Sequence, residues 1–276
     1  MRSDRLVVLG LMALPAAWVV AGMADTQVTA PKALPRVLYM TECKGFVHGS
    51  VKISRRIVPE LGLRTRAFVV DVSEDSSDIN AANLENYQAL VFYTSGELPM
   101  SDQDKQAMMD WIKAGHGFVG IHSANDTFYK WDEYGEMLGG YFDGHPWTQE
   151  VRIKLEDPDH WACNLIPNPW VIKDEIYQHK QWSREKIHVV MSLDNSSVNV
   201  NKSKHKVKDF PIAWCKLHGK GRVFYTGLGH FDEVWRNHKF QRHLANGIRW
   251  ALGLVPGDAT PSAELGKGPA SSDAAQ

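Results

Sequence analysis

The sequence predicts an α/β fold: a flavodoxin-like parallel sheet with helices on both faces, elaborated by antiparallel strands in the second half. Two observations support this prediction. In residues 36–121, short apolar runs alternate with helix-like segments, which is the pattern of parallel strands joined by helices. Beyond residue 149, strand-like runs follow one another with little helix between them, which favours antiparallel pairing.

The first half contains predicted strands and helices in alternation. The strands are residues 36–40, 65–72, 89–93 and 117–121, and the helix-like segments are residues 48–61, 79–87 and 101–114. The last helix starts at Ser101-Asp102-Gln103-Asp104, which resembles a capping box, and stops at Gly115, because glycine commonly ends helices. The apolar run 117–121 is typical of a strand buried on both faces.

The second half is predicted to be rich in strands. They are residues 149–155, 170–176, 188–193, 212–218 and 222–226. The stretch 216–221 contains Gly219 and Gly221 around a lysine, which predicts a tight hairpin between the last two strands. Residues 240–252 form a predicted closing helix, because Phe240, Leu244 and Ile248 recur at helical spacing.

The ends of the chain differ in composition from the middle. Residues 1–24 combine an early basic stretch, an apolar run and small residues at Gly22-Met23-Ala24, which is typical of a cleaved signal peptide. An uncleaved anchor is the alternative, because the run approaches the length of a membrane span. Residues 25–35 are a predicted flexible lead-in, 36–254 one domain, and 255–276 a disordered tail. We therefore expect a secreted or periplasmic protein that is free of the membrane once the signal is removed.

The charge balance and the cysteines exclude several function classes. The chain has 31 Lys and Arg against 32 Asp and Glu, a net charge of −1, so nothing indicates a nucleic-acid partner. The three cysteines, Cys43, Cys163 and Cys215, form no C-x-x-C motif, which argues against a thiolate zinc site. An odd count leaves at least one of them free or paired between two chains, and a pairing of Cys163 with Cys215 stays open.

Histidines follow several predicted strands. His122 ends the strand 117–121, His230 ends the strand 222–226, and His48 follows the loop after the first strand. Because the carboxyl ends of parallel strands meet at one edge of the sheet, we expect these three to converge, with His145 closing over them from a long loop. Imidazole can act there as a general acid, a general base or a metal ligand. Asp232 lies two residues after His230 and is predicted to orient its ring.

Each of these histidines could instead be structural, as most isolated histidines are. The position between glycines and a core strand favours function for His122 and His230, whereas His48 and His145 are more evenly balanced. The chain contains no Gly-x-Ser-x-Gly elbow, phosphate loop, dinucleotide fingerprint or His-Glu-x-x-His pair. The common hydrolase and nucleotide-binding signatures are therefore excluded.

Several short blocks spread over residues 36–252 form a joint pattern. They are Phe46-Val47-His48, Gly120-Ile121-His122-Ser123-Ala124-Asn125-Asp126, Gly144-His145-Pro146, Asp174-Glu175-Ile176-Tyr177, Pro211-Ile212-Ala213-Trp214, the run from Gly219 to His230, Phe240-Gln241-Arg242 and Gly247-Ile248-Arg249-Trp250-Ala251. With these blocks the chain resembles the ThuA-like (trehalose utilisation) family, a branch of the class I glutamine amidotransferase-like fold. No single block would be specific, but together they are.

The resemblance also carries chemical implications. True amidotransferases have a cysteine nucleophile where this chain has His122, and their histidine, followed two residues later by a glutamate, resembles His230 and Asp232. A glutaminase mechanism is therefore not expected. The family resemblance implies carbohydrate chemistry through 3-keto sugars, with a small carbohydrate as the substrate and a separate sugar dehydrogenase as a partner.

The leading hypothesis is proton transfer next to the ketone of a 3-keto sugar or glycoside, by isomerisation, elimination or hydrolysis. In this hypothesis His122 and His230, with Asp232, are catalytic. The predicted substrate-binding residues are His48, His145, Asp126, Glu175 and Tyr177. A divalent metal such as Zn²⁺, held by His48, His122, His145 and His230, could polarise the ketone instead.

Two other hypotheses stay open at this point. One is a metal-dependent hydrolase that uses the same histidines around zinc. The other is a non-catalytic sugar-binding module, because the usual nucleophile of the amidotransferase scaffold is missing.

Overall fold

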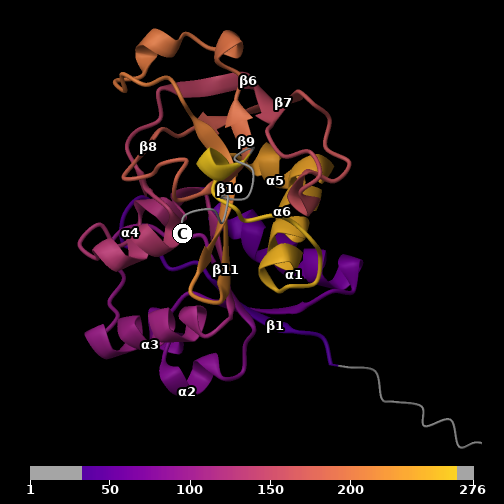
Figure 1. The fold of residues 1–276 in the computed structure, drawn as a ribbon. Helices are drawn as coiled ribbons and strands as arrows, with labels where there is room; N and C mark the ends of the chain where they lie inside the picture. The colour runs from indigo at the N-terminus through magenta and orange to yellow at the C-terminus, as the bar shows by residue number, and fades with distance from the viewer. Residues whose placement is uncertain (1–32, 266–276) are drawn as a thin grey trace, which may run out of the picture. The chain divides into compact units, whose positions relative to one another are not determined.

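A nine-stranded sheet organises residues 33–265, the part of the chain that the computed structural model describes (Figure 1). Its strands are β1 (Arg36–Met40), β2 (Val69–Ser73), β3 (Ala89–Phe92), β4 (Gly117–Ile121), β6 (Trp147–Leu155), β7 (Trp170–Ile176), β9 (His188–Leu193), β10 (Pro211–His218) and β11 (Gly221–Thr226). They lie in the order β2-β1-β3-β4-β11-β10-β9-β6-β7. The short strands β5 (Tyr141–Phe142) and β8 (His179–Lys180) pair separately.

The sheet changes from parallel to antiparallel in its middle. β2, β1, β3, β4 and β11 are all parallel, and β10, β9, β6 and β7 then alternate in direction. This arrangement confirms the predicted α/β sheet with antiparallel additions. Because four alternations follow β11, β7 again points the same way as the parallel strands. Its carboxyl end can therefore reach the same edge as theirs.

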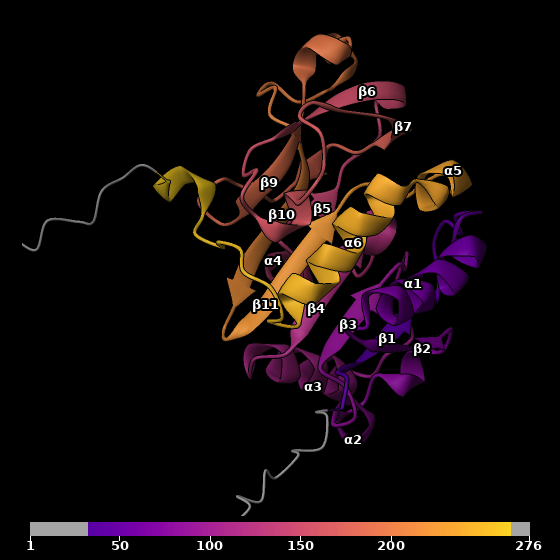
Figure 2. The same ribbon diagram turned by 90° about the vertical axis from the view of Figure 1, so that its right-hand side faces the viewer.

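Helices cover both faces of the sheet (Figures 1 and 2). On one face lie α1 (Val51–Thr65), α5 (Asp232–Arg236) and α6 (His238–Ala251), whose buried residues belong to one core cluster. On the other face lie α2 (Ala81–Leu84), α3 (Asp102–Lys113) and α4 (Asp132–Leu138), which contribute to a second cluster. The two faces thus have separate apolar cores, as expected for a sheet buried on both sides.

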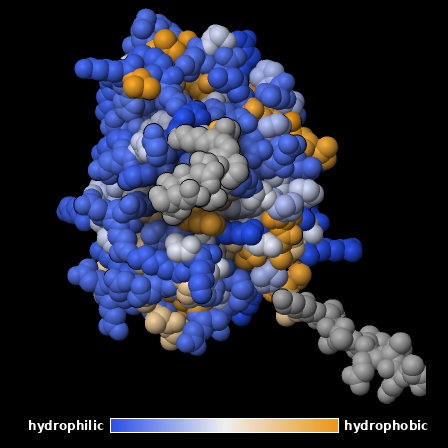
Figure 3. Space-filling model, in the orientation of Figure 1, coloured by the Kyte–Doolittle hydropathy of each residue, from blue (hydrophilic) through white to orange (hydrophobic). Residues whose placement is uncertain are grey.

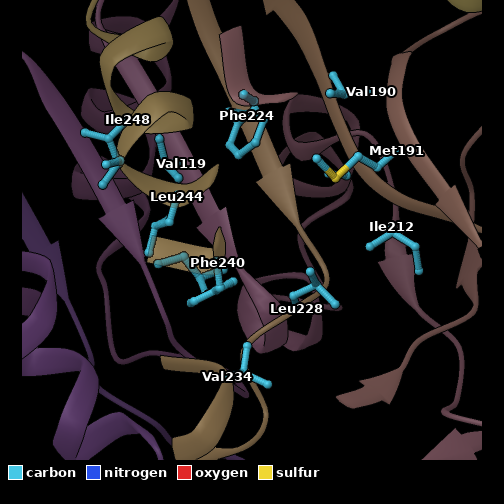
Figure 4. Close-up of a cluster of buried hydrophobic side chains, with 14 of the residues drawn as sticks. Val119, Val190, Met191, Ile212, Phe224, Leu228, Val234, Phe240, Leu244 and Ile248 are labelled. Carbon is cyan, nitrogen blue, oxygen red and sulfur yellow. The ribbon is translucent and has the colours of Figure 1, made fainter. Parts of the chain in front are cut away.

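The larger core joins α6 to the middle of the sheet. Phe240, Leu244 and Ile248 lie on the buried side of α6, beside Val119 of β4 and Phe224 of β11 (Figure 4). The close approach of α6 also depends on a glycine. A Cβ atom at position 247 would lie 2.3 Å from a ring carbon of Phe224, so a larger residue there would force helix and strand apart.

Most predicted elements are present, with shifts at their ends. Ser101 caps α3 as expected, because its hydroxyl accepts a hydrogen bond from the N–H of Asp104 at 3.1 Å. The first helix begins at Val51 rather than at His48, so His48 stands on the preceding loop. The second strand begins at Val69, because Arg66 adopts a left-handed backbone conformation (φ 51°) that ends α1.

The segment 255–265 is docked on the antiparallel part of the sheet. The buried His188 ring donates a hydrogen bond through Nδ1–H to the Thr260 carbonyl oxygen at 2.7 Å. The Val189 N–H donates to the Ser262 hydroxyl at 2.8 Å. The predicted disorder from residue 255 onward is therefore wrong as far as residue 265, because Val255 packs into the larger core and hydrogen bonds hold Thr260 and Ser262.

The remaining sequence predictions about the chain ends lie outside the described residues. The predicted signal peptide (residues 1–24) and nearly all of the predicted lead-in (residues 25–35) fall within residues 1–32, which the structure does not describe. Within residues 33–265, no helix is long and apolar enough to span a membrane. The face shown in Figure 3 is mostly hydrophilic, with hydrophobic residues in small separate patches. The three cysteines are free, so the possible pairing of Cys163 with Cys215 is not formed.

Truncation after Leu254 is expected to lower the free energy of unfolding by about 1–3 kcal/mol. The reason is that the buried donors of His188 and Val189 would lose their acceptors. Urea unfolding measures the change, and truncation after Leu265 is the matched control, which should keep full stability. Equal stability of the two truncated proteins would show that the segment contributes nothing.

Candidate functional site

Four side chains converge at the carboxyl edge of the parallel strands. They are His48 on the loop after β1, His122 directly after β4, His230 after β11, and Glu175 near the end of β7. One potential ligand atom from each lies within 4.8 Å of all the others. The ring centroid of His48 is 4.7 Å from that of His122 and 5.0 Å from that of His230. The structure thus brings together the three histidines that the sequence placed at strand ends.

His122 is held in one orientation and one tautomer. Its backbone is left-handed (φ 45°), which is a strained conformation for a residue with a side chain. Nδ1–H donates to the Gly227 carbonyl oxygen at 2.7 Å, because a carbonyl can only accept. The lone pair of the neutral ring is therefore on Nε2, which lies 3.5 Å from Glu175 Oε2. The Tyr177 ring stacks on His122 at a centroid distance of 4.2 Å and fixes its plane.

Asp174, which the sequence analysis did not single out, fixes the backbone of the site. Its carboxylate is fully buried and accepts hydrogen bonds from the N–H groups of Gly229 (2.7 Å), His230 (3.1 Å) and Glu175 (2.9 Å). An acidic pair near the carboxyl end of a predicted strand that begins with Trp170-Val171-Ile172 is the signal that could have identified it. Asp174 therefore positions two members of the cluster without contacting their side chains.

The Gly229 peptide is a second fixed point. Its carbonyl oxygen is 2.9 Å from both the Tyr93 hydroxyl and the Ser50 hydroxyl, and it accepts a hydrogen bond from Trp235 Nε1–H at 2.8 Å. Gly229 has a φ of 129°, a conformation that favours glycine. The loop that carries His230 is thus tied to β3, to the start of α1 and to α5.

The electrostatics of the cluster favour a neutral His48 ring beside an ionised Glu175, whereas His230 is shifted toward its protonated form. Burial, together with the neighbouring His122 and His230, lowers the pKa of His48 to about 3. Burial also raises the pKa of Glu175, but contacts with His122 and His230 outweigh it and hold that pKa well below its usual range. For His230, burial lowers the pKa, and contact with Glu175 more than compensates, so the pKa is raised.

These groups fit a divalent metal ion. Three ring nitrogens, His48 Nδ1, His122 Nε2 and His230 Nδ1, are buried and have no hydrogen-bond partner among the described residues. His230 Nδ1 lies 3.0 Å from Glu175 Oε2, without the alignment of a hydrogen bond. Ligand atoms around tetrahedral zinc lie about 3.3 Å apart, so small side-chain shifts would suffice. Imidazole nitrogens with one carboxylate suit zinc and similar transition metals.

The other predicted site residues have different surroundings. His145 Nδ1 lies 3.3 Å from Glu175 Oε1, with 52% of its side chain exposed, so it stands at the mouth of the cluster. Asp126 accepts a hydrogen bond from the Tyr129 hydroxyl at 2.7 Å and is not a member of the cluster. Asp232 pairs with Arg236 at 3.0 Å on the exposed side of α5. The predicted orienting role of Asp232 is therefore corrected: Glu175 is the carboxylate beside the His230 ring.

Two exposed apolar side chains form a rim beside the cluster. Phe46 and Val47 are each 64% exposed, and the centroid of the Phe46 ring lies 4.8 Å from that of the His48 ring. Their loop is fixed, because the Ser95 carbonyl oxygen accepts from Gly45 N–H at 3.1 Å and the Ser95 hydroxyl donates to the Phe46 carbonyl at 2.7 Å. An apolar pair held rigidly in solvent next to a polar cluster is suited to contact a ligand.

Fold and site together define an α/β protein with a His₃Glu cluster at the carboxyl edge of its parallel strands. The family described as ThuA, trehalose utilisation, matches residues 36–251, so the chain belongs to the ThuA family. The family name connects the chain with carbohydrates. This membership confirms the resemblance found in the sequence.

Solved structures show the same fold. A ThuA-like protein from Bacteroides uniformis is 23% identical, with a TM-score of 0.68 over 82% of this chain and 94% of that one. A ThuA-like protein from Parabacteroides merdae is 18% identical, with a TM-score of 0.64 over 82% and 93%. A search of curated proteins found no match.

Glu175→Gln and His122→Ala are expected to weaken Zn²⁺ binding at least about tenfold, because each removes one of four converging ligands. Metal content after dialysis and competition with a chromophoric chelator measure the effect. Asp232→Asn is the matched control, since Asp232 is acidic and near in sequence but pairs with Arg236. Equal zinc affinity in all four proteins would refute a metal site at the cluster.

Zinc affinity is expected to fall as the pH drops below neutral. The raised pKa of His230 means that a proton must leave this ring when a metal binds, so affinity falls about tenfold per pH unit below that pKa. His48, with a pKa of about 3, adds no such competition near neutral pH. Chelator competition between about pH 5.5 and 8 tests this, and a flat profile would contradict it.

Proposed function

We propose that this protein is a metal-dependent enzyme that acts on an oxidised (keto) sugar or glycoside. The observation that carries the proposal is the set of three buried ring nitrogens without hydrogen-bond partners, gathered around Glu175. An exposed fourth histidine, His145, stands beside them. Membership of a family named for trehalose utilisation supports a carbohydrate as the substrate.

The chemistry follows from the ketone. A divalent ion held by His48, His122, His230 and Glu175 would polarise the ketone oxygen and acidify the neighbouring C–H. His145 is placed to accept that proton, because it is accessible and its Nδ1 faces Glu175 Oε1 at 3.3 Å, which orients the ring. The other three histidines are committed to the cluster, so proton transfer falls to His145 rather than to His122 and His230.

Elimination gives a balanced reaction for a 3-keto glycoside. The proton on C2 passes to His145, the electrons of the C2–H bond form a double bond between C1 and C2, and the C1–O bond breaks. The departing oxygen takes a proton and leaves as an alcohol. Addition of water to the double bond would complete a net hydrolysis, and return of a proton without C1–O cleavage would give an isomerisation.

The rim gives room for the departing group. Phe46 and Val47 present a fixed apolar surface beside His48, and apolar or aromatic surfaces contact the faces of sugar rings well. We infer that this rim contacts the part of the glycoside that leaves. Tyr177, 4% exposed and stacked on His122, serves to hold the cluster rather than to contact the substrate.

The proposal extends to the setting of the reaction. A keto sugar requires an oxidation step, so a separate sugar dehydrogenase would supply the substrate. The signal-like residues 1–24 support export, which would place the reaction of this protein outside the cytoplasm.

Zinc-loaded protein is expected to convert a 3-keto-disaccharide but not the unoxidised disaccharide, and a mass-spectrometric time course measures this. His145→Ala should lower kcat by about 10²- to 10⁴-fold, the usual contribution of a general base, while zinc content stays unchanged. His238→Ala, another exposed histidine on the surface, is the matched control and should keep full activity.

Three outcomes would count against the proposal. Sugar binding without turnover, unaffected by loss of the metal, would favour a non-catalytic sugar-binding module. Turnover that survives complete metal removal would show that no metal is needed, and it would favour proton transfer by His122 and His230. Conversion of the unoxidised disaccharide would show a hydrolase that needs no ketone.

A further inference from the structure

A second polar groove lies along the helical face, far from the histidine cluster. Its volume is about 450 Å³, and it is lined by the last turn of α1, by α6 and by the short 3-10 helix Trp161–Cys163. α1 has 15 residues, so it is about 22 Å long. His48 precedes its first turn and Arg64 lies in its last, so the groove is separate from the site described above.

Positive charge dominates this groove. Three arginines, Arg64, Arg242 and Arg249, line it together with His238, and among its described lining residues none is acidic. The whole chain carries a net charge of −1, so the concentration of guanidinium groups here is a local feature. An anion is the ligand that such a field attracts.

The groove also has more hydrogen-bond donors than free acceptors. Two of its amide oxygens already accept from arginines: Arg64 donates to Gln241 Oε1 at 2.7 Å, and Arg249 donates through Nη1 to Asn246 Oδ1 at 3.1 Å. Arg249 Nε is buried and has no acceptor among the described residues. A ligand that carries acceptor oxygens would therefore satisfy this buried donor.

Part of the groove is also preorganised. Arg249 is fixed by its bond to Asn246 and by the Trp161 ring, whose centroid is 5.8 Å from the guanidinium carbon. Arg242 is exposed, and no salt bridge holds it within the described residues. Arg242 and Arg249 lie seven residues apart on α6 and line the same groove. One fixed and one unpaired guanidinium suit an oxyanion, because each guanidinium can donate two parallel hydrogen bonds to phosphate oxygens.

We propose that this groove binds the phosphate group of a small molecule, with Arg242 and Arg249 as its principal contacts. The site is independent of the metal centre and of the reaction proposed for it. Arg64, already bonded to Gln241, contributes charge at the end of the groove. A free phosphate ion and a phosphate carried on an organic molecule offer the same acceptor oxygens.

Isothermal titration of the full-length protein with inorganic phosphate and with a sugar phosphate tests the proposal. The protein is first freed of metal with a chelator, so that phosphate cannot bind at the histidine cluster. Saturable binding at one site per chain is expected, weakened at least about tenfold by Arg242→Gln and by Arg249→Gln. Arg236→Gln is the matched control, because Arg236 is an exposed arginine of α5 outside the groove, and it should bind as the wild type does.

Two results would overturn the proposal. One is that the wild-type protein shows no saturable binding at concentrations of either ligand up to about 10 mM. The other is that both groove variants bind phosphate with the affinity of the wild-type protein. Arg242 is exposed, so its variant should fold and decides the test even if Arg249→Gln does not fold. Tighter binding of the sugar phosphate than of inorganic phosphate would identify an organic phosphate as the ligand class, whereas equal affinity would identify the free ion.

Discussion

The buried carboxylate of Asp174 joins the two halves of the sheet at the site. It belongs to β7, at the antiparallel end, and it accepts backbone N–H groups from Gly229 and His230, which follow the parallel strand β11. β7 is four strands away from β11 in the sheet, so this contact requires the antiparallel half to curl over the carboxyl edge. Burial raises the pKa of Asp174, and a buried carboxylate is costly unless such hydrogen bonds satisfy it. The position of Glu175 depends on this arrangement, because its own N–H is the third donor.

The cluster next to Asp174 is organised by the same balance of burial and pairing. A lone buried Glu175 would be destabilising, but two imidazole rings face it within 3.5 Å. His48 and His122, in turn, are buried with nitrogens that have no hydrogen-bond partner among the described residues. Each such nitrogen is destabilising in the protein alone. Their arrangement is explained if a cation completes it, because one ion would satisfy these two nitrogens, His230 Nδ1 and the Glu175 carboxylate together.

Periodicity predicted the strands and the long helices well, because α3, α6 and the strand pattern depend on local signals such as the Ser101 cap. The convergence of His48, His122 and His230 also followed from topology, since residues after parallel strands meet at one edge. The place of Glu175 inside the cluster could not be predicted, because it depends on how far the antiparallel half curls. The role given to Asp232 failed for a related reason. Asp232 is close to His230 in the sequence, but it lies in the short helix α5, where its side chain pairs with Arg236 one turn later. The sequence distance alone could not predict this orientation.

Access to the cluster follows from the unequal burial of its members. His122 is fully buried and His48 is 4% exposed, so the cluster is closed to solvent on the side of these two rings. The open side is that of His145. The loop that carries His145 is held in place by its neighbour Asp143, whose carboxylate contacts Lys204 at 2.8 Å and His205 at 2.7 Å. Lys204 and His205 therefore fix the loop that carries His145 beside the cluster.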